Sequence, residues 1–190
     1  KKFLLLLALF FCSVTAVNAE TNRIISGNQN AKIVILAYES LTCSHCADFH
    51  KNVYPQLKKD YIDTGLAKIE FRHFPLDAAA FNASKIIQCK HDQGMKILES
   101  LYSNQQAWIK GNTIEQVNNN LQKFIEKEGF QVNFEKCINN KKIEEFVLND
   151  RIEGVKNFKI NATPTIIIND KKFEKSLNYK NLKETLEKLI

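Results

Sequence analysis

The segment TCSHCA at residues 42–47 follows closely on the stretch KIVILAYES at residues 32–40, and this junction decides the fold. The apolar centre of the first stretch is typical of a buried strand. After the segment, apolar residues recur every four positions, which predicts one face of an amphipathic helix over residues 44–62. Two cysteines, Cys43 and Cys46, therefore stand where a strand turns into a helix.

A second main strand completes a strand–helix–strand unit. Residues 68–74 (KIEFRHF) alternate polar with apolar side chains, and Pro75 ends the pattern. We expect Pro55 to kink the connecting helix, because proline cannot donate to the carbonyl group four residues back. Strands joined in this way run parallel, with a right-handed crossover.

The rest of the chain separates into a helical block and a second sheet segment. Residues 77–158 carry helical patterns only, whereas residues 165–168 (TIII) predict a strand and Asn169–Asp170 a hairpin turn after it. Residues 179–190 predict a terminal helix. The sequence therefore predicts an α/β fold with an all-helical domain inserted between two halves of a sheet domain. The expected divisions are a first half at 20–76, an insert at 77–158 and a second half at 159–190, with insert helices near 77–91, 94–104, 113–128, 133–139 and 141–157.

The first residues have the pattern of a secretory signal peptide. Lys1 and Lys2 precede a continuous apolar run, and small residues at 17–19 offer a cleavage site before Glu20. The alternative is an uncleaved anchor, but residues 3–17 are fewer than the roughly 20 apolar residues that a spanning helix needs. We therefore expect a cleaved leader at 1–19 and export to the periplasm, where paired cysteines are common.

The charge balance argues against a nucleic-acid-binding protein. The chain has a formal net charge of +6, and cleavage would remove two lysines and no acid, which leaves +4. The charges are scattered along the chain without a block of one sign, which is typical of a solvated surface.

The position of the two cysteines suggests redox chemistry. The first turn of a helix has unpaired N–H groups and partial positive charge, so it stabilises a thiolate at Cys43, and a protonated His45 would add to this. Cys46 lies one turn later and deeper in the helix. We therefore expect Cys43 to be the attacking thiol and Cys46 to resolve the mixed disulfide.

A C-x-x-C pair can also attach haem, bind zinc or form a structural disulfide. Haem attachment requires His directly after the second cysteine, where this chain has Ala47. A zinc site could use Cys46 and His50, but no second close pair of ligands completes it. We therefore predict no metal and no cofactor, and an inert structural disulfide stays open as an alternative.

Four segments together resemble the DsbA-like branch of the thioredoxin superfamily, and the resemblance covers nearly all of residues 28–190. It implies a thioredoxin-like fold with a helical domain docked beside its core. It also implies an exported thiol:disulfide oxidoreductase that introduces disulfide bonds into reduced exported polypeptides and is reoxidised by a membrane partner. The segments are TCSHCA at 42–47, RHFPL at 72–76, residues 89–94 followed by Trp108, and ATPT at 162–165.

The resemblance also implies roles for residues outside the cysteine motif. Pro164 resembles the family's cis-proline, which would turn the backbone of Thr163 toward Cys43 and leave it free to pair with an extended substrate. The two remaining cysteines of the mature chain, Cys89 and Cys137, lie on different predicted helices of the insert. We expect them to form a structural disulfide.

The chain departs from the family pattern at two positions. Ser44 stands where the family usually has proline, and Ala37 stands where it often has a buried acid. Glu39 is on the same strand face as Ala37 and could replace that acid as a proton acceptor for Cys46. Alternatively, Glu39 merely reaches solvent at the end of its strand.

The sequence leaves two rival functions open. One is a disulfide isomerase or reductase of the same fold, and the other is a holdase chaperone in which the cysteines are incidental. We favour the oxidase because residues 20–31 are too few for the dimerisation segment that isomerases of this fold generally carry before the first main strand. Thr163 before the proline is also common in isomerases and keeps that alternative open.

Overall fold

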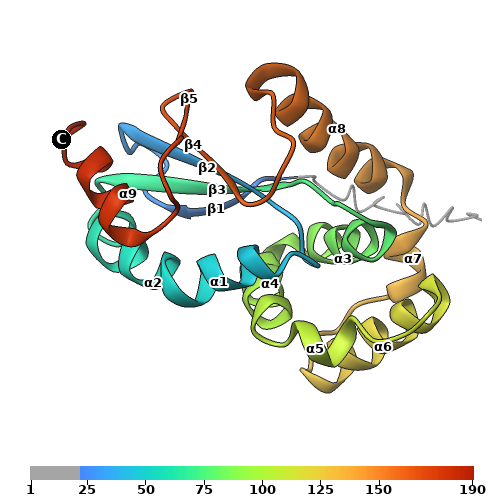
Figure 1. Cartoon of the computed structure of the whole chain (residues 1–190). Helices are drawn as coiled ribbons and strands as arrows, with labels where there is room; N and C mark the ends of the chain where they lie inside the picture. Colours follow the sequence, from blue (N-terminus) through green and yellow to red (C-terminus); the bar gives the residue numbers. More distant parts are fainter. Residues whose placement is uncertain (1–21) are drawn as a thin grey trace, which may run out of the picture.

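The computed structural model describes residues 22–190, which form a five-stranded mixed sheet with helices on both faces (Figure 1). β2 and β3 pair in parallel, as predicted, and the other neighbours are antiparallel. The predicted signal peptide at 1–19 lies outside the described residues. Within residues 22–190, no helix is long and apolar enough to span a membrane. In spatial order the strands are β1 (Ile24–Gly27), β3 (Ala67–His73), β2 (Ile33–Glu39), β4 (Thr165–Ile168) and β5 (Lys171–Lys172).

The predicted helix over residues 44–62 is in fact three successive pieces, which are α1 (Ser44–Asn52), α2 (Tyr54–Leu57) and the π-helix η1 (Lys58–Ile62). Pro55 lies in the first turn of α2, where its missing N–H group costs no hydrogen bond, so the chain breaks before the proline. The kink expected at Pro55 is thus a break at Val53, directly before the helix that contains the proline, and it divides the predicted helix.

The helical insert between β3 and β4 is confirmed, and it contains one short helix that the sequence pattern did not indicate, α5. The terminal helix α9 (Tyr179–Leu186) ends earlier than expected. The helices of the insert are α3 (Ala78–Cys89), the 3-10 turn η2 (His91–Gln93), α4 (Gly94–Ser103), α5 (Gln105–Trp108), α6 (Ile114–Lys127), α7 (Phe134–Ile138) and α8 (Lys141–Phe158).

The two faces of the sheet bury different sets of side chains because successive residues of a strand point to opposite sides. Ile35 and Ala37 of β2 belong to the large core that also contains residues of α1 and α2, whereas Tyr38 packs on the opposite face. In Figure 1, α8 lies on one side of the sheet and α1 and α2 lie on the other. Glu39, two positions after Ala37, therefore points to the face that α1 covers.

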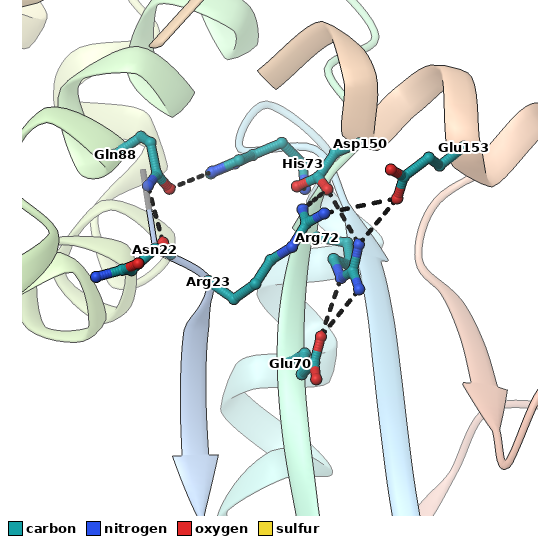
Figure 2. A network of polar contacts seen from close by, with 8 residues as sticks. All are labelled: Asn22, Arg23, Glu70, Arg72, His73, Gln88, Asp150 and Glu153. Carbon is teal, nitrogen blue, oxygen red and sulfur yellow. Dashed lines mark hydrogen bonds and ion pairs between the residues drawn. The ribbon is translucent and has the colours of Figure 1, made fainter. Parts of the chain in front are cut away.

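A buried carboxylate fastens α8 to the sheet (Figure 2). Asp150 is fully buried and accepts hydrogen bonds from the guanidinium groups of Arg23 and Arg72 and, at 3.0 Å, from the backbone N–H of His73. Glu70 and Glu153 pair with Arg72 at the rim of this cluster. The charge of Asp150 is thus compensated from two neighbouring strand segments, as a buried charge requires.

His73 connects the same cluster to the insert. Its ring nitrogen Nε2 lies 3.3 Å from the side-chain oxygen of Gln88 on α3, and the amide nitrogen of Gln88 donates to the backbone carbonyl of Asn22 at 2.8 Å (Figure 2). Burial lowers the pKa of His73 to about 4. The imidazole is therefore neutral at neutral pH, and the insert is held to the sheet edge by uncharged hydrogen bonds.

Candidate active site

The two cysteines lie at the start of α1, directly after the turn that leaves β2. Cys43 is the residue that caps α1, with an extended backbone, and its amide donates to the carbonyl of Ser40 at 3.0 Å. The Cys43 side chain is half-buried, whereas Cys46 is completely buried, and both are free thiols in this structure. The pair therefore has one sulfur that a substrate can reach and one that it cannot.

The surroundings of the two sulfurs shift their pKa values in opposite directions. The hydrogen bond from the Cys46 thiol, followed by contacts with Thr163 and with the N–H groups of Cys46 and His45, lowers the pKa of Cys43 to about 5, although burial opposes the shift. Burial first, then the hydrogen bond to Cys43 and the charge of Glu39, raise the pKa of Cys46 strongly. At neutral pH Cys43 is the thiolate and Cys46 keeps its proton.

The loop before β4 contributes the residues that face Cys43. The Sγ of Cys43 donates to the carbonyl oxygen of Thr163 at 3.3 Å, and the Thr163–Pro164 peptide bond is cis. The hydroxyl of Thr163 is buried and has no hydrogen bond of ordinary geometry within residues 22–190. The pairing of β4 beside β2 brings this loop to the active-site end of the sheet.

A surface groove of about 620 Å³ runs alongside the cysteine pair. The side chain of His45 is exposed and lines this groove. Residues 177–179, which precede and begin α9, form part of the opposite wall, and no local sequence signal indicated that they would approach the active site. The lining residues are His45, Asp48, Phe49, Asn52, Val53, Thr163, Pro164, Leu177, Asn178 and Tyr179.

Glu39 is buried on the α1 side of the sheet, so the alternative that it reaches solvent is wrong. Its Oε2 lies 2.8 Å from Nε2 of His50, which sequence analysis had considered only as a partner of Cys46 in a zinc site. His50 follows Cys46 by four positions, a spacing that places both on one helix face and could have linked them. Within residues 22–190, no three potential ligands gather to hold a metal ion.

The other two cysteines of the described residues are bonded to each other. Cys89 at the end of α3 and Cys137 in α7 form a disulfide bond, with their Cα atoms 5.6 Å apart. The bond joins two segments of the insert that are 48 positions apart in the sequence. It therefore leaves Cys43 and Cys46 as the free thiols among the described residues.

Comparisons with known proteins agree with this geometry. The thioredoxin family model matches residues 19–188. The crystal structure of alpha-DsbA1 from Wolbachia pipientis is similar, with 31% sequence identity, a TM-score of 0.77, and coverage of 88% of this chain and 90% of that one. BdbD from Bacillus subtilis shares the fold at 23% identity and a TM-score of 0.74, over 87% of this chain and 91% of that one.

Curated relatives extend the comparison. A "Putative protein-disulfide oxidoreductase" of Rickettsia bellii is 28% identical over 154 residues, which are 79% of this chain and 58% of that protein. "Disulfide bond formation protein D" of Bacillus subtilis is 26% identical over 85% of this chain and 74% of its own length. The chain thus spans little more than half of the Rickettsia relative. The family match over nearly the whole chain and the likeness to alpha-DsbA1 place it in the thioredoxin family, among the DsbA-like thiol:disulfide oxidoreductases.

Proposed function

We propose that this chain introduces disulfide bonds into exported polypeptides, using the Cys43–Cys46 disulfide as the electron acceptor. The main support is the contrast between the two sulfurs at the start of α1. The pKa of the half-buried Cys43 is lowered to about 5, whereas that of the buried Cys46 is raised. A thiol with a low pKa is a good leaving group, so a mixed disulfide at Cys43 is readily displaced by a second substrate thiol.

The reaction consists of two exchanges. A substrate thiolate attacks Sγ of Cys43, the Cys43–Cys46 bond breaks, and its electron pair and a proton end on Cys46. A second substrate thiolate then attacks the sulfur of the first, and Cys43 leaves as a thiolate. The substrate loses two electrons and two protons. The enzyme gains the two electrons and one proton, and the second proton goes to solvent.

Thr163 and the groove beside it are the proposed substrate contact. The loop at Thr163 lies against Cys43, so an extended peptide bound there would have its cysteine next to the reactive sulfur. The groove is lined by both polar and apolar side chains, which suits polypeptides of varied sequence better than one small ligand.

The location and the second partner belong to the same proposal. The signal-peptide pattern at 1–19 and the Cys89–Cys137 disulfide both suit an exported protein in an oxidising compartment such as the periplasm. Each turnover leaves the pair reduced, so we propose a membrane redox partner that accepts the two electrons and restores the disulfide.

The test compares oxidation of a reduced two-cysteine peptide with repair of a scrambled disulfide protein. We expect fast peptide oxidation by the oxidised chain, loss of this activity in Cys43→Ser, and a trapped mixed disulfide in Cys46→Ser. Efficient repair of the scrambled protein together with slow peptide oxidation would show that the chain is an isomerase and not an oxidase. Protection of an aggregating client that survives Cys43→Ser, without peptide oxidation by the wild type, would favour the holdase.

A further inference from the structure

Each opening of the Cys43–Cys46 bond requires a proton at a place that solvent does not reach. Cys46 leaves as a thiolate, and its surroundings raise its pKa, so it must take up a proton as the bond breaks and lose it again on reoxidation. The residue is fully buried beneath α1. Protein groups must therefore carry the proton between Cys46 and the surface.

Two buried side chains next to Cys46 are placed to do this. Glu39, at the end of β2, is close enough that its charge contributes to the raised pKa of Cys46. His50 follows Cys46 by four residues on α1, and its Nε2 lies 2.8 Å from Glu39 Oε2. Only 5% of the His50 side chain and 3% of the Glu39 side chain are exposed.

The other polar atom of each side chain in this pair makes no hydrogen bond within residues 22–190, which is unusual for a purely structural ion pair. Glu39 Oε1 and His50 Nδ1 are both buried and have no hydrogen-bond partner in the described part of the chain. Buried polar groups are satisfied in the great majority of cases, and an exception calls for an explanation. Here the free carboxylate oxygen and the free ring nitrogen stand at the two ends of a connected unit, as a proton path requires.

The His50 end of the pair reaches a second surface cavity, distinct from the groove beside Thr163. This cavity has a volume of about 300 Å³ and lies between α1 and the end of α4. The ring of Tyr102 stacks on that of His50 with 4.3 Å between centroids. The residues that line the cavity are Ala47, Asp48, His50, Lys51, Tyr102 and Ser103.

The other titratable groups around the pair do not replace it at neutral pH. Burial, then the charges of Glu39 and Cys46 and the hydrogen-bonding approach of its hydroxyl to Glu39, raise the pKa of Tyr102 well above its ordinary value, and burial raises that of Tyr54 to about 12. Both hydroxyls therefore stay protonated. The titratable or charged groups that face the pair or its cavities are Cys46, Asp48 and Lys51 from α1, Tyr54 from α2, Arg72 and His73 from β3, and Tyr102 from α4.

We propose that His50 is a positioning residue that holds Glu39 beside Cys46 and relays the proton between Glu39 and the cavity. This inference rests on the proposed dithiol–disulfide exchange. As the Cys43–Cys46 bond breaks, Glu39 passes to Cys46 a proton that it takes from Nε2 of His50, and Nδ1 of His50 takes one from water in the cavity. During reoxidation the same proton travels outward.

The experiment isolates the step in which Cys46 loses its proton. Reduced protein reacts with oxidised glutathione at Cys43, and the rate at which Cys46 then resolves the mixed disulfide is followed from about pH 5 to about pH 9 by acid quench. We expect His50→Gln to slow this resolution by roughly 100-fold at about pH 7, with a rate that rises steadily with pH, because hydroxide replaces the relay.

Matched measurements separate a relay from a packing role. Lys51→Gln changes the same cavity without touching Glu39 and should resolve at the wild-type rate. The pH dependence of Cys43 alkylation should be unchanged in His50→Gln, and the double variant with Glu39→Gln should be no slower than the slower single variant, because both residues act in one path. Added imidazole should restore the rate of His50→Ala through the cavity.

Resolution by His50→Gln with the wild-type rate and pH profile would overturn the relay. Absence of rescue in His50→Ala, together with altered Cys43 alkylation in both His50 variants, would also overturn it, because the defect would then be general distortion. Failure of the wild-type chain to oxidise a peptide would instead refute the proposed function. The two failures are distinguishable because the glutathione measurement uses no peptide.

Discussion

The thiol of Cys43 lies 3.3 Å from the carbonyl oxygen of Thr163, a residue 120 positions further along the chain. This contact joins the start of α1 to the loop that enters β4. It also places the buried hydroxyl of Thr163 among the groups that lower the pKa of the reactive sulfur.

Replacement of the Thr163 hydroxyl should weaken the Cys43 thiolate. Thr163→Val removes a group that helps to lower the pKa of Cys43 to about 5, so we expect the midpoint of Cys43 alkylation against pH to move upward. Thr42→Val is the matched control, because the Thr42 hydroxyl donates to Asp77 at 2.7 Å instead. An unchanged midpoint in Thr163→Val would show that the hydroxyl does not act on the sulfur.

Cys43 should be the one thiol of the reduced active site that reacts in mild acid. Its pKa of about 5 leaves much of it ionised there, whereas Cys46 is buried with a raised pKa. Alkylation with iodoacetamide at about pH 5, followed by peptide mapping, should label Cys43 first. Equal labelling of Cys46 would contradict the division of roles between the two sulfurs.

Removal of the disulfide in the insert should lower stability without changing the redox site. The Cys89–Cys137 bond closes a loop of 48 positions, for which the chain-entropy estimate is about 4 kcal/mol. The double substitution Cys89→Ala with Cys137→Ala should reduce the free energy of unfolding in urea by about that amount. Cys43 alkylation serves as the control and should be unaffected, since the bond lies outside the active site.

Loss of the Asp150 charge should loosen α8 from the sheet. Asp150 is fully buried against two partly buried guanidinium groups and a backbone N–H, so Asp150→Asn leaves the two cations undercompensated and should cost about 3 kcal/mol. Glu153→Gln, with a half-exposed side chain in the same cluster, should cost less than about 1 kcal/mol. If both variants lose the same free energy of unfolding in urea, burial of Asp150 does not make its charge more important for stability than that of Glu153.

His73 should make the fold sensitive to mild acid. Its pKa falls from 6.5 to about 4 on folding. Between these two pH values the imidazole is protonated in the unfolded chain and neutral in the folded chain. The contribution is fully present above about pH 6.5 and is lost as the pH falls toward about 4, with a total of about 3 kcal/mol. His73→Gln should flatten this part of the stability curve, whereas replacement of the exposed His91 by Gln should not.

Local patterns were sufficient for the parts of this protein in which neighbouring residues decide the structure. The alternation in residues 68–74 and the apolar run in 32–40 predicted β3 and β2, and the helix between them made these strands parallel. The spacing of Cys43 and Cys46 at a strand–helix junction predicted which sulfur is accessible. The same local reasoning joined the pieces of the first helix into one, because periodicity persists across the break before Pro55.

The sequence by itself therefore determined the strand–helix–strand unit, the helical insert and the place of Cys43 and Cys46 at a helix start, because periodicity and the unpaired N–H groups of a helix start act over a few residues. Only the tertiary structure decided whether Glu39 is buried or solvated, and that His50 is its partner. It also decided the contact between Thr163 and Cys43. These contacts join distant segments, so they depend on how the strands pair and how the helices pack over the sheet, which no local pattern encodes.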